Sequence, residues 1–258
     1  MRGILFILLV LLIATPVAAA DRGQTRWYDV ELIIFTPSGE NFLNAEAWPK
    51  EPQLPKIENA RLPGQATRAQ GLEAFQILTP GQQQLGGAYH RLKTSSQFEP
   101  LVHIGWRQPG LSKDKALPVR ITLDSNGRVL TGGQATSAAP RGALSQQPDL
   151  PRLDGTVTVV LSRYLHLKTD LVYRIEADSV THRRTRPDPA VIDLSTSVRS
   201  YDAQGRDETL FDQGPTVEEP RYLEFVVNDS RRMRSRELHY LDHPVLGVIA
   251  LITPYEAP

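Results

Sequence analysis

Apolar and polar residues alternate in several short stretches of this chain, and this alternation limits the folds open to it. The first stretch runs from Arg26 to Phe35 and carries Asp29 and Glu31 on one face. Its other face is apolar and consists of Tyr28, Val30, Leu32 and Ile34. Because successive side chains of a β-strand point to opposite faces, a period of two predicts half-buried strands. We expect further strands at 101–107, 118–123, 128–131, 153–176, 221–232, 237–240 and 246–253.

Two of these segments carry turn signals. The stretch 153–176 is longer than the usual five or six residues of a strand, so we expect a turn near Arg163 or Lys168. The stretches 118–123 and 128–131 flank Asn126-Gly127. An Asn-Gly pair accepts the positive φ angles of a tight turn, which predicts a hairpin at this point.

The segment Thr79-Pro80-Gly81-Gln82 predicts the N-terminus of a helix. The threonine is placed as the N-cap, proline stands at the first helical position, and Gln82 completes a capping box. Apolar residues then recur at helical spacing: Leu85, Ala88, Tyr89 and Leu92. One clear helix among many short strands predicts an α+β fold that is mostly antiparallel β-sheet with few helices.

Three segments read as connections. The prolines of 47–64 predict an extended path, the Ser- and Gln-rich stretch 132–151 a mobile loop, and 182–189 a basic linker. We expect a single domain over 21–258, with two lobes divided at 132–151 as the alternative.

The N-terminal segment 1–20 has the three parts of a cleavable signal peptide. Arg2 provides the basic start, Ile4 to Ile13 the apolar core, and three alanines a cleavage site after Ala20. The alternative is a membrane anchor, but a helix over this core spans only about half of a ~30 Å hydrocarbon layer. We therefore expect an exported, periplasmic protein with no membrane span in its mature part.

Composition removes several functional classes. The chain has no cysteine, which excludes lipidation at a cleavage-site cysteine, thiol catalysis and thiolate metal sites. Its formal net charge is +0, so no overall field draws it to nucleic acid or anionic lipid. Any electrostatic binding is then local.

Several motifs, in order along the chain, resemble those of one known family. They are Trp27 to Glu31, Gly105 to Pro109, Leu153 to Thr156, Arg163 to Leu167, Arg231 to Ser235, and Glu237 to Pro244 followed by Gly247. The sequence is similar over essentially its whole mature length to the CsiV family of peptidoglycan-binding proteins from the periplasm of Gram-negative bacteria.

This resemblance implies a non-enzymatic role in cell-wall biogenesis and cell shape. Members of the family bind peptidoglycan and support a bifunctional penicillin-binding synthase through the synthase's outer-membrane lipoprotein activator. The resemblance implies no catalytic residue and no cofactor, so its motifs are carried over as positions only.

An arginine run is the first candidate ligand surface. On a strand, Arg232, Arg234 and Arg236 would project from one face about 6.6 Å apart, with Arg231 beside them. Guanidinium groups bind carboxylates in bidentate fashion, and the peptides of peptidoglycan carry free carboxylates. For any single arginine the favoured interpretation is a solvated edge strand, which charges protect from aggregation.

Aromatic residues give two further candidates. Trp106, with Arg107 and Gln108, could stack on a sugar ring, although a core position is favoured because of the area that Trp buries. Tyr164 and His166 would share one face of a strand, where a structural and a binding role are equally open.

The tail motif contains a possible metal site, since His239 and His243 have the H-x-x-x-H spacing that places two imidazoles on one face of a helix. Pro244 disfavours helix at the preceding residue. We therefore favour a hairpin turn in which Asp242 and His243 satisfy backbone groups, with no metal.

Two other functional classes stay open. A cell-wall hydrolase would need opposed carboxylates, and a serine acyl-transferase a nucleophile with a base. Ser112 and Lys115 match S-x-x-K, but they stand in a polar loop without a later K-T-G strand. The third class is an outer-membrane assembly adaptor, which would differ in its partners.

Overall fold

The computed structural model describes residues 25–39, 41–49, 51–69, 71–132, 150–177 and 222–256. The predicted signal peptide, the basic linker 182–189 and nearly all of the predicted loop 132–151 lie outside the described residues. The short helices are η1 (Asn41–Asn44), η2 (Pro80–Gln82) and α1 (Gly86–Thr94). The strands are β1 (Trp27–Pro37), β2 (Thr67–Ala69), β3 (Leu72–Ala74), β4 (Gln76–Ile77), β5 (Phe98–Pro109), β6 (Val119–Arg120), β7 (Leu153–Leu161), β8 (Leu165–Glu176), β9 (Tyr222–Met233), β10 (Leu238–Leu241) and β11 (Gly247–Tyr255).

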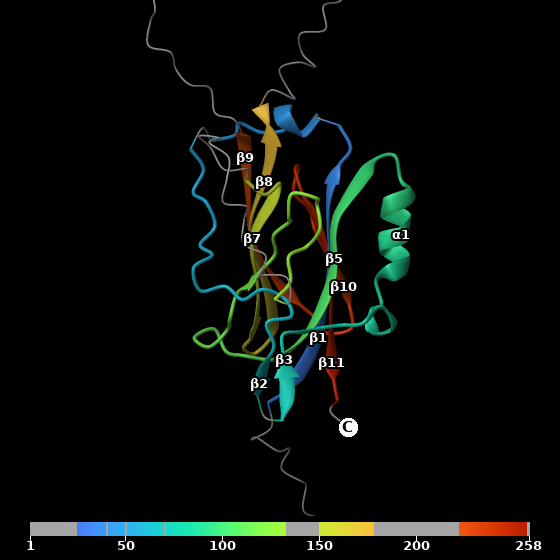
Figure 1. The fold of residues 1–258 in the computed structure, drawn as a ribbon, viewed down its shortest axis with the longest axis vertical. Coiled ribbons are helices and arrows are strands. Elements are labelled where there is room, and N and C mark those ends of the chain that lie inside the picture. The colour runs from blue at the N-terminus through green and yellow to red at the C-terminus, as the bar shows by residue number, and fades with distance from the viewer. Residues whose placement is uncertain are drawn as a thin grey trace, which may run out of the picture.

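The strands form two main antiparallel sheets (Figure 1). The five-stranded sheet has the order β10-β11-β1-β5-β4, and the four-stranded sheet has the order β6-β7-β8-β9. A separate hairpin pairs β2 with β3. The predicted class, α+β and mostly antiparallel β-sheet with few helices, is confirmed.

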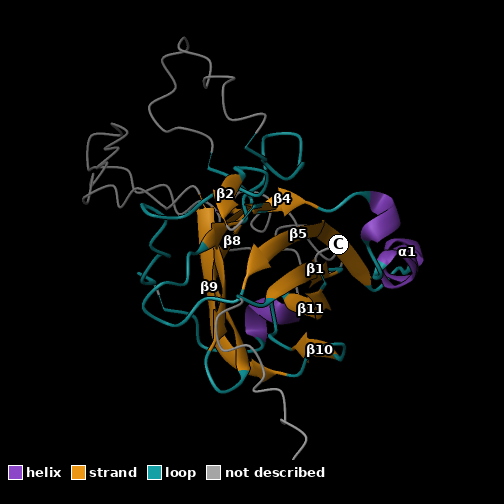
Figure 2. Cartoon of the chain, turned by 90° about the horizontal axis from the view of Figure 1, so that it is seen from below, coloured by secondary structure: helices purple, strands orange, loops and turns teal. Residues whose placement is uncertain are grey.

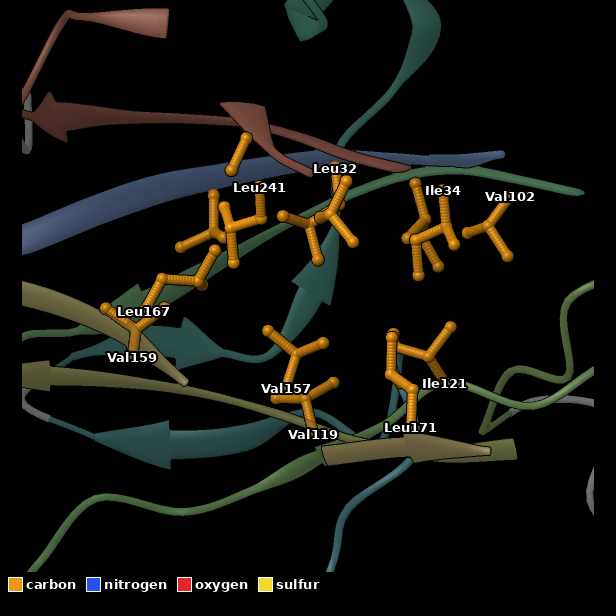
Figure 3. Close-up of a cluster of buried hydrophobic side chains, with 14 of the residues drawn as sticks. Leu32, Ile34, Val102, Val119, Ile121, Val157, Val159, Leu167, Leu171 and Leu241 are labelled. Atoms are coloured by element: carbon orange, nitrogen blue, oxygen red, sulfur yellow. The ribbon is translucent and has the colours of Figure 1, made fainter. Parts of the chain in front are cut away.

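The core lies between the two main sheets. Leu32 and Ile34 of β1 face Val157 of β7 and Leu171 of β8 (Figure 3). These residues are buried because the predicted alternation of β1 places its even-numbered apolar side chains toward the second sheet. One hydrophobic cluster thus unites both sheets, and it contains the apolar residues predicted for β1.

Helix α1 covers part of the outer face of the five-stranded sheet (Figure 1). Leu85, Ala88, Tyr89 and Leu92 pack there with Ile33 and Phe35 of β1, which confirms their predicted helical spacing. The predicted helix start needs correction. The capping box of Thr79 and Gln82 forms, but it caps η2, a single 3-10 turn, and α1 begins only at Gly86.

A carboxylate of the sheet stands where a side-chain cap is missing from α1. Glu31 accepts hydrogen bonds from the amides of Gln84 (2.7 Å) and Leu85 (2.9 Å), and its Oε1 lies 2.8 Å from His103 Nε2. An anion at this end of a helix satisfies free amides and interacts favourably with the helix dipole. Glu31 therefore fixes α1 to the sheet.

Most predicted turns are found. The stretch 153–176 divides into β7 and β8 at residues 162–164, so the turn lies at Arg163 and not at Lys168. The turn at Asn126-Gly127 forms, with Gly127 at φ 73, but its flanks meet only at the bridge of Leu123 with Val129. The predicted hairpin is therefore present but short, with hydrogen bonds from the amides of Asp124 and Leu130 to the carbonyls of Arg128 and Thr122. The short strands β2, β3 and β4 were not predicted.

Close packing explains why two positions of the sequence motifs are glycine. Gly155 has φ 138, and a Cβ there would collide with the backbone of Asp170 on β8. A Cβ on Gly247 would collide with the ring of Phe35. Both positions therefore accept glycine for structural reasons. Within the described part, no helix combines the length and hydropathy that a membrane crossing needs.

Candidate functional site

The structure brings three of the predicted site residues together at one end of the four-stranded sheet. Tyr164 ends the turn between β7 and β8, and His166 on β8 is the cross-strand partner of Arg232 on β9. The Arg232 guanidinium carbon lies 3.9 Å from the centre of the Tyr164 ring. His166 Nδ1 is 3.2 Å from the Tyr164 carbonyl oxygen, to which it can donate. We call these residues the Tyr164 cluster.

The pleat of the sheet directs the Tyr164 cluster away from the core. Leu165 and Leu167 on β8 and Met233 on β9 are buried. Because successive side chains of a strand point to opposite faces, His166 and Arg232 face outward. The Tyr164 side chain is accordingly 43% exposed and Arg232 is exposed. The cluster therefore lies on the exposed part of the outer face, along β8 and β9, whereas Val160, the β7 neighbour of His166 on that face, is buried.

The charge of Arg232 is not neutralised within the described part of the chain. No carboxylate there lies within ion-pair distance of its guanidinium, although six other arginines have such a partner. A guanidinium has five N–H donors in a planar fork. Stacking on Tyr164 holds this fork in place and leaves its edge available for an anionic ligand.

Trp106 is placed differently from the predicted sugar platform. Its side chain is fully buried in the core, and its indole N–H donates to Gln108 Oε1 at 2.7 Å. A ring with no exposed face cannot stack on a sugar, so the platform hypothesis is wrong and the favoured core position is found.

Arg107 also serves the fold. Its Nε and Nη2 donate to the two carboxylate oxygens of Asp29 at 2.6 and 2.8 Å, and its guanidinium lies 3.3 Å from the centre of the Tyr255 ring. The Asp29 carboxylate raises the pKa of the Arg107 guanidinium. One edge of Arg107 is bound to Asp29, its face lies against Tyr255, and its side chain is only 12% exposed, which removes it from the candidate site.

The arginine run does not form the predicted row. Strand β9 ends at Met233, so Arg234 and Arg236 are not on a strand. Arg234 contacts Glu237 at 3.5 Å, and Arg236 takes φ 65 in the turn before β10. Arg231 pairs opposite Leu167 and therefore faces the other side of the sheet from Arg232. Of the run, only Arg232 joins the Tyr164 cluster.

The histidines of the tail motif bond to the backbone. His239 Nε2 accepts the amide hydrogen of Arg234 (3.0 Å), and His243 Nδ1 accepts that of Val245 (3.3 Å). Burial lowers the pKa of His243, although Glu46, Asp229 and Asp242 oppose this effect. Among the described residues, no group of three or more His, Asp and Glu side chains could hold a metal ion. The contact of His243 agrees with the favoured turn, whereas Asp242 bonds a tyrosine hydroxyl and not a backbone group.

Asp242 lies beside this turn and accepts the hydroxyl hydrogen of Tyr240 at 2.7 Å. Burial and this hydrogen bond raise the pKa of Tyr240 to about 12. Asp242 and His243 also line a cavity of about 110 Å³ between β9 and the β10–β11 pair. A pocket for a small molecule usually measures about 300 Å³ or more, so this cavity is too small to hold one. The exposed Tyr164 cluster is the better candidate for binding a polymer.

The S-x-x-K match does not have the arrangement of an activated serine. The Ser112 side chain hydrogen-bonds the Asp114 carboxylate and lowers the pKa of Asp114. The amides of Lys115 and Ala116 donate to the Ser112 carbonyl at 2.9 and 2.8 Å, which makes this segment a tight turn.

One site residue was missed. Lys168 is exposed two positions after His166 on β8 and therefore lies on the same outer face. The period of two, applied from Tyr164 onward, would have found it. Lys168 extends the positive surface beyond the Tyr164 cluster.

Comparison with known proteins identifies one match. A family model described as "Peptidoglycan-binding protein, CsiV" matches residues 4–255. No curated protein and no solved structure matches the chain.

Proposed function

The chain belongs to the CsiV family of peptidoglycan-binding proteins, and from that premise we propose that it binds peptidoglycan through the Tyr164 cluster without catalysing a reaction. The observation that carries this site is the guanidinium of Arg232, which is stacked on an exposed tyrosine and has no carboxylate partner in the described part of the chain.

The chemistry of the cluster suits a peptide-crosslinked glycan. Arg232 can bind a stem-peptide carboxylate in bidentate fashion, and the exposed Tyr164 ring can pack against the apolar face of a sugar. Lys168 adds a second cation on the same face. The exposed surface along β8 and β9 can also accept a ligand that extends along the strands, as a glycan strand does.

We further propose that the protein works in the periplasm after cleavage behind Ala20, as a single domain over 21–258. In this role it supports cell-wall synthesis by a bifunctional penicillin-binding synthase through its outer-membrane lipoprotein activator. Family membership supports this assignment. It can be tested by measuring glycan polymerisation by the purified synthase, with and without its activator and this protein.

The binding site is tested by co-sedimentation with purified sacculi. Replacing Arg232→Ala removes charge-assisted hydrogen bonds, so we expect about tenfold weaker binding, and Tyr164→Ala should weaken binding as well. The matched control is Arg68→Ala on β2, which also removes an exposed arginine. Unchanged sedimentation of both Tyr164 cluster variants, with the wild-type melting temperature, would place the peptidoglycan site elsewhere.

A further inference from the structure

A second surface with features of a binding site lies at the edge of the five-stranded sheet. Strand β10 pairs with β11 on one side and stands at the end of the sheet (Figure 2). Among the described residues, no backbone group bonds to its other side. An exposed edge of this kind is a template for pairing with another strand.

Two apolar side chains make this edge unusual. Leu238 is 57% exposed and Tyr240 is 42% exposed, and they are two of five large exposed hydrophobic residues in the described part of the chain. Both point to the outer face of the sheet, since they alternate with His239. The Tyr240 ring is held by stacking on Phe35, with 6.1 Å between ring centres. The edge is therefore apolar and pre-ordered.

The charges at the two ends of β10 are opposite. Arg236 and Glu237 precede the strand and Asp242 follows it, and all three are exposed. Glu237 lies 3.5 Å from Arg234, so Arg236 is the cation at this end that has no carboxylate partner among the described residues. An antiparallel copy of the same strand would therefore bring each positive end beside a negative end. With the two-fold axis at His239, Arg236 meets Asp242 of the second copy and Leu238 meets Tyr240 of the second copy. Each of these contacts occurs twice, because the interface is isologous.

We propose that β10 pairs with β10 of a second copy and joins two five-stranded sheets into one continuous sheet. Cross-strand pairs of an aromatic and an aliphatic residue, and of opposite charges, stabilise such a ribbon. A four-residue strand gives a small interface, below the ~1,200 Å² of stable complexes, so the dimer forms reversibly.

The Tyr164 cluster is on the other sheet and shares no residue with β10. Two copies on one sacculus would also be held at high effective concentration, which strengthens a weak contact. The dimer itself does not depend on the proposed peptidoglycan site and is tested without any ligand.

The decisive test is charge reversal with mixing, followed by analytical ultracentrifugation over a range of protein concentrations. Wild-type protein should approach twice the mass of one chain as concentration rises. Arg236→Asp and Asp242→Arg each place like charges opposite each other, so each alone should raise the dissociation constant about tenfold or more. An equimolar mixture of the two variants restores both opposite-charge pairs and should dimerise again. Asp is among the residues best suited to the positive φ of position 236.

The control variant is Arg68→Asp, which changes the same charge on β2, and circular dichroism confirms that every variant is folded. A wild type that stays monomeric at all concentrations overturns the proposal. The same is true if the mixture fails to dimerise, or if both reversals leave the dimer intact.

Cross-linking provides a second readout of the register. The chain has no cysteine, so His239→Cys would place one thiol per copy at the two-fold axis. Opposed residues of an antiparallel pair are close enough for a disulfide. Mild oxidation should give a covalent dimer with His239→Cys and none with Arg68→Cys. Equal cross-linking of both variants would contradict pairing at β10.

Discussion

Arg107 and Arg232 each lie over a tyrosine ring, and they differ in the residue that pairs with them across the strands. Arg107 stands opposite Asp29 on β1, whereas Arg232 stands opposite His166 on β8. The first guanidinium is held by two hydrogen bonds to its partner, and the second has no carboxylate among the described residues. We call Arg107 with Asp29 the closed pair, because a carboxylate binds the guanidinium. We call Arg232 with His166 the open pair, because no carboxylate of the described residues does so.

This difference teaches how a binding residue can be recognised. A paired and largely buried arginine is shielded from a ligand, and removing its partner harms the fold. An exposed arginine without a carboxylate partner costs the fold little when it is lost. Changes at the closed pair should therefore lower stability, whereas changes at Arg232 should weaken ligand binding and leave stability nearly unchanged.

The largest expected effect is on the closed pair. Asp29→Asn leaves the Arg107 charge without its counter-ion in a site where both side chains are mostly buried. We expect a loss of about 3 kcal/mol in the free energy of unfolding, measured by urea denaturation. Arg232→Ala should lose about 0.5 kcal/mol or less. Similar losses for both variants would remove the distinction between the two arginines.

The second prediction concerns the buried carboxylate beside the closed pair. Burial disfavours the charged form of Glu31, but hydrogen bonds from His103, Gln84 and Leu85 outweigh burial and hold the pKa of Glu31 below its usual value. A lowered pKa in the folded state gives stability that is present above the unfolded pKa and lost as pH falls through the folded pKa.

Glu31→Gln should therefore lose about 2 kcal/mol at neutral pH, because hydrogen bonds to a charged group are removed. The difference from wild type should shrink as pH falls below about 4.5, where the unfolded carboxyl group is protonated. Urea denaturation at several pH values measures this. A difference that stays constant down to acid pH would mean that ionised Glu31 does not stabilise α1.

The third prediction converts the open pair into a closed one. His166→Asp places a carboxylate opposite Arg232, as Asp29 lies opposite Arg107. The new ion pair would occupy the guanidinium, so sacculus binding should weaken about tenfold. His166→Asn is the control of matched size and should bind far better than His166→Asp. If the two variants bind sacculi equally, the free charge of Arg232 is not what binds.

The smallest expected effect is the change in melting temperature when metal is added or removed. His239 and His243 each use one ring nitrogen to accept a backbone amide. A zinc ion would compete with part of this arrangement, so neither added zinc nor a chelator should change the melting temperature. A fall in melting temperature with chelator, together with zinc released from the protein, would restore the metal hypothesis.

Much of the sheet could be predicted because its strands alternate clearly. The core face of β1 and the positions of β9, β10 and β11 follow from a period of two. The start of α1 could not be read in the same way. The two amides just before it, of Gln84 and Leu85, are satisfied by Glu31, which is far away in sequence, and the local capping signal at Thr79 serves η2.

The candidate site was only partly predictable for a related reason. Tyr164 and His166 are neighbours in sequence, so their proximity follows from one strand. Their contact with Arg232 depends on the register between β8 and β9, which no local pattern sets. The roles of Trp106 and Arg107 depended likewise on Gln108 and Asp29, whose positions only the folded sheet reveals.

The place of β1 in the five-stranded sheet also affects how the chain can mature. This first strand pairs along its length with β11, the last one, and Thr36 bonds to the Val245 carbonyl across 209 residues. Strand β1 therefore cannot pair with β11 until β11 has been synthesised, and the five-stranded sheet forms only after that. Contacts of such long range slow folding. The backbone groups of β1 that face β11 therefore stay without their strand partners until β11 has been made.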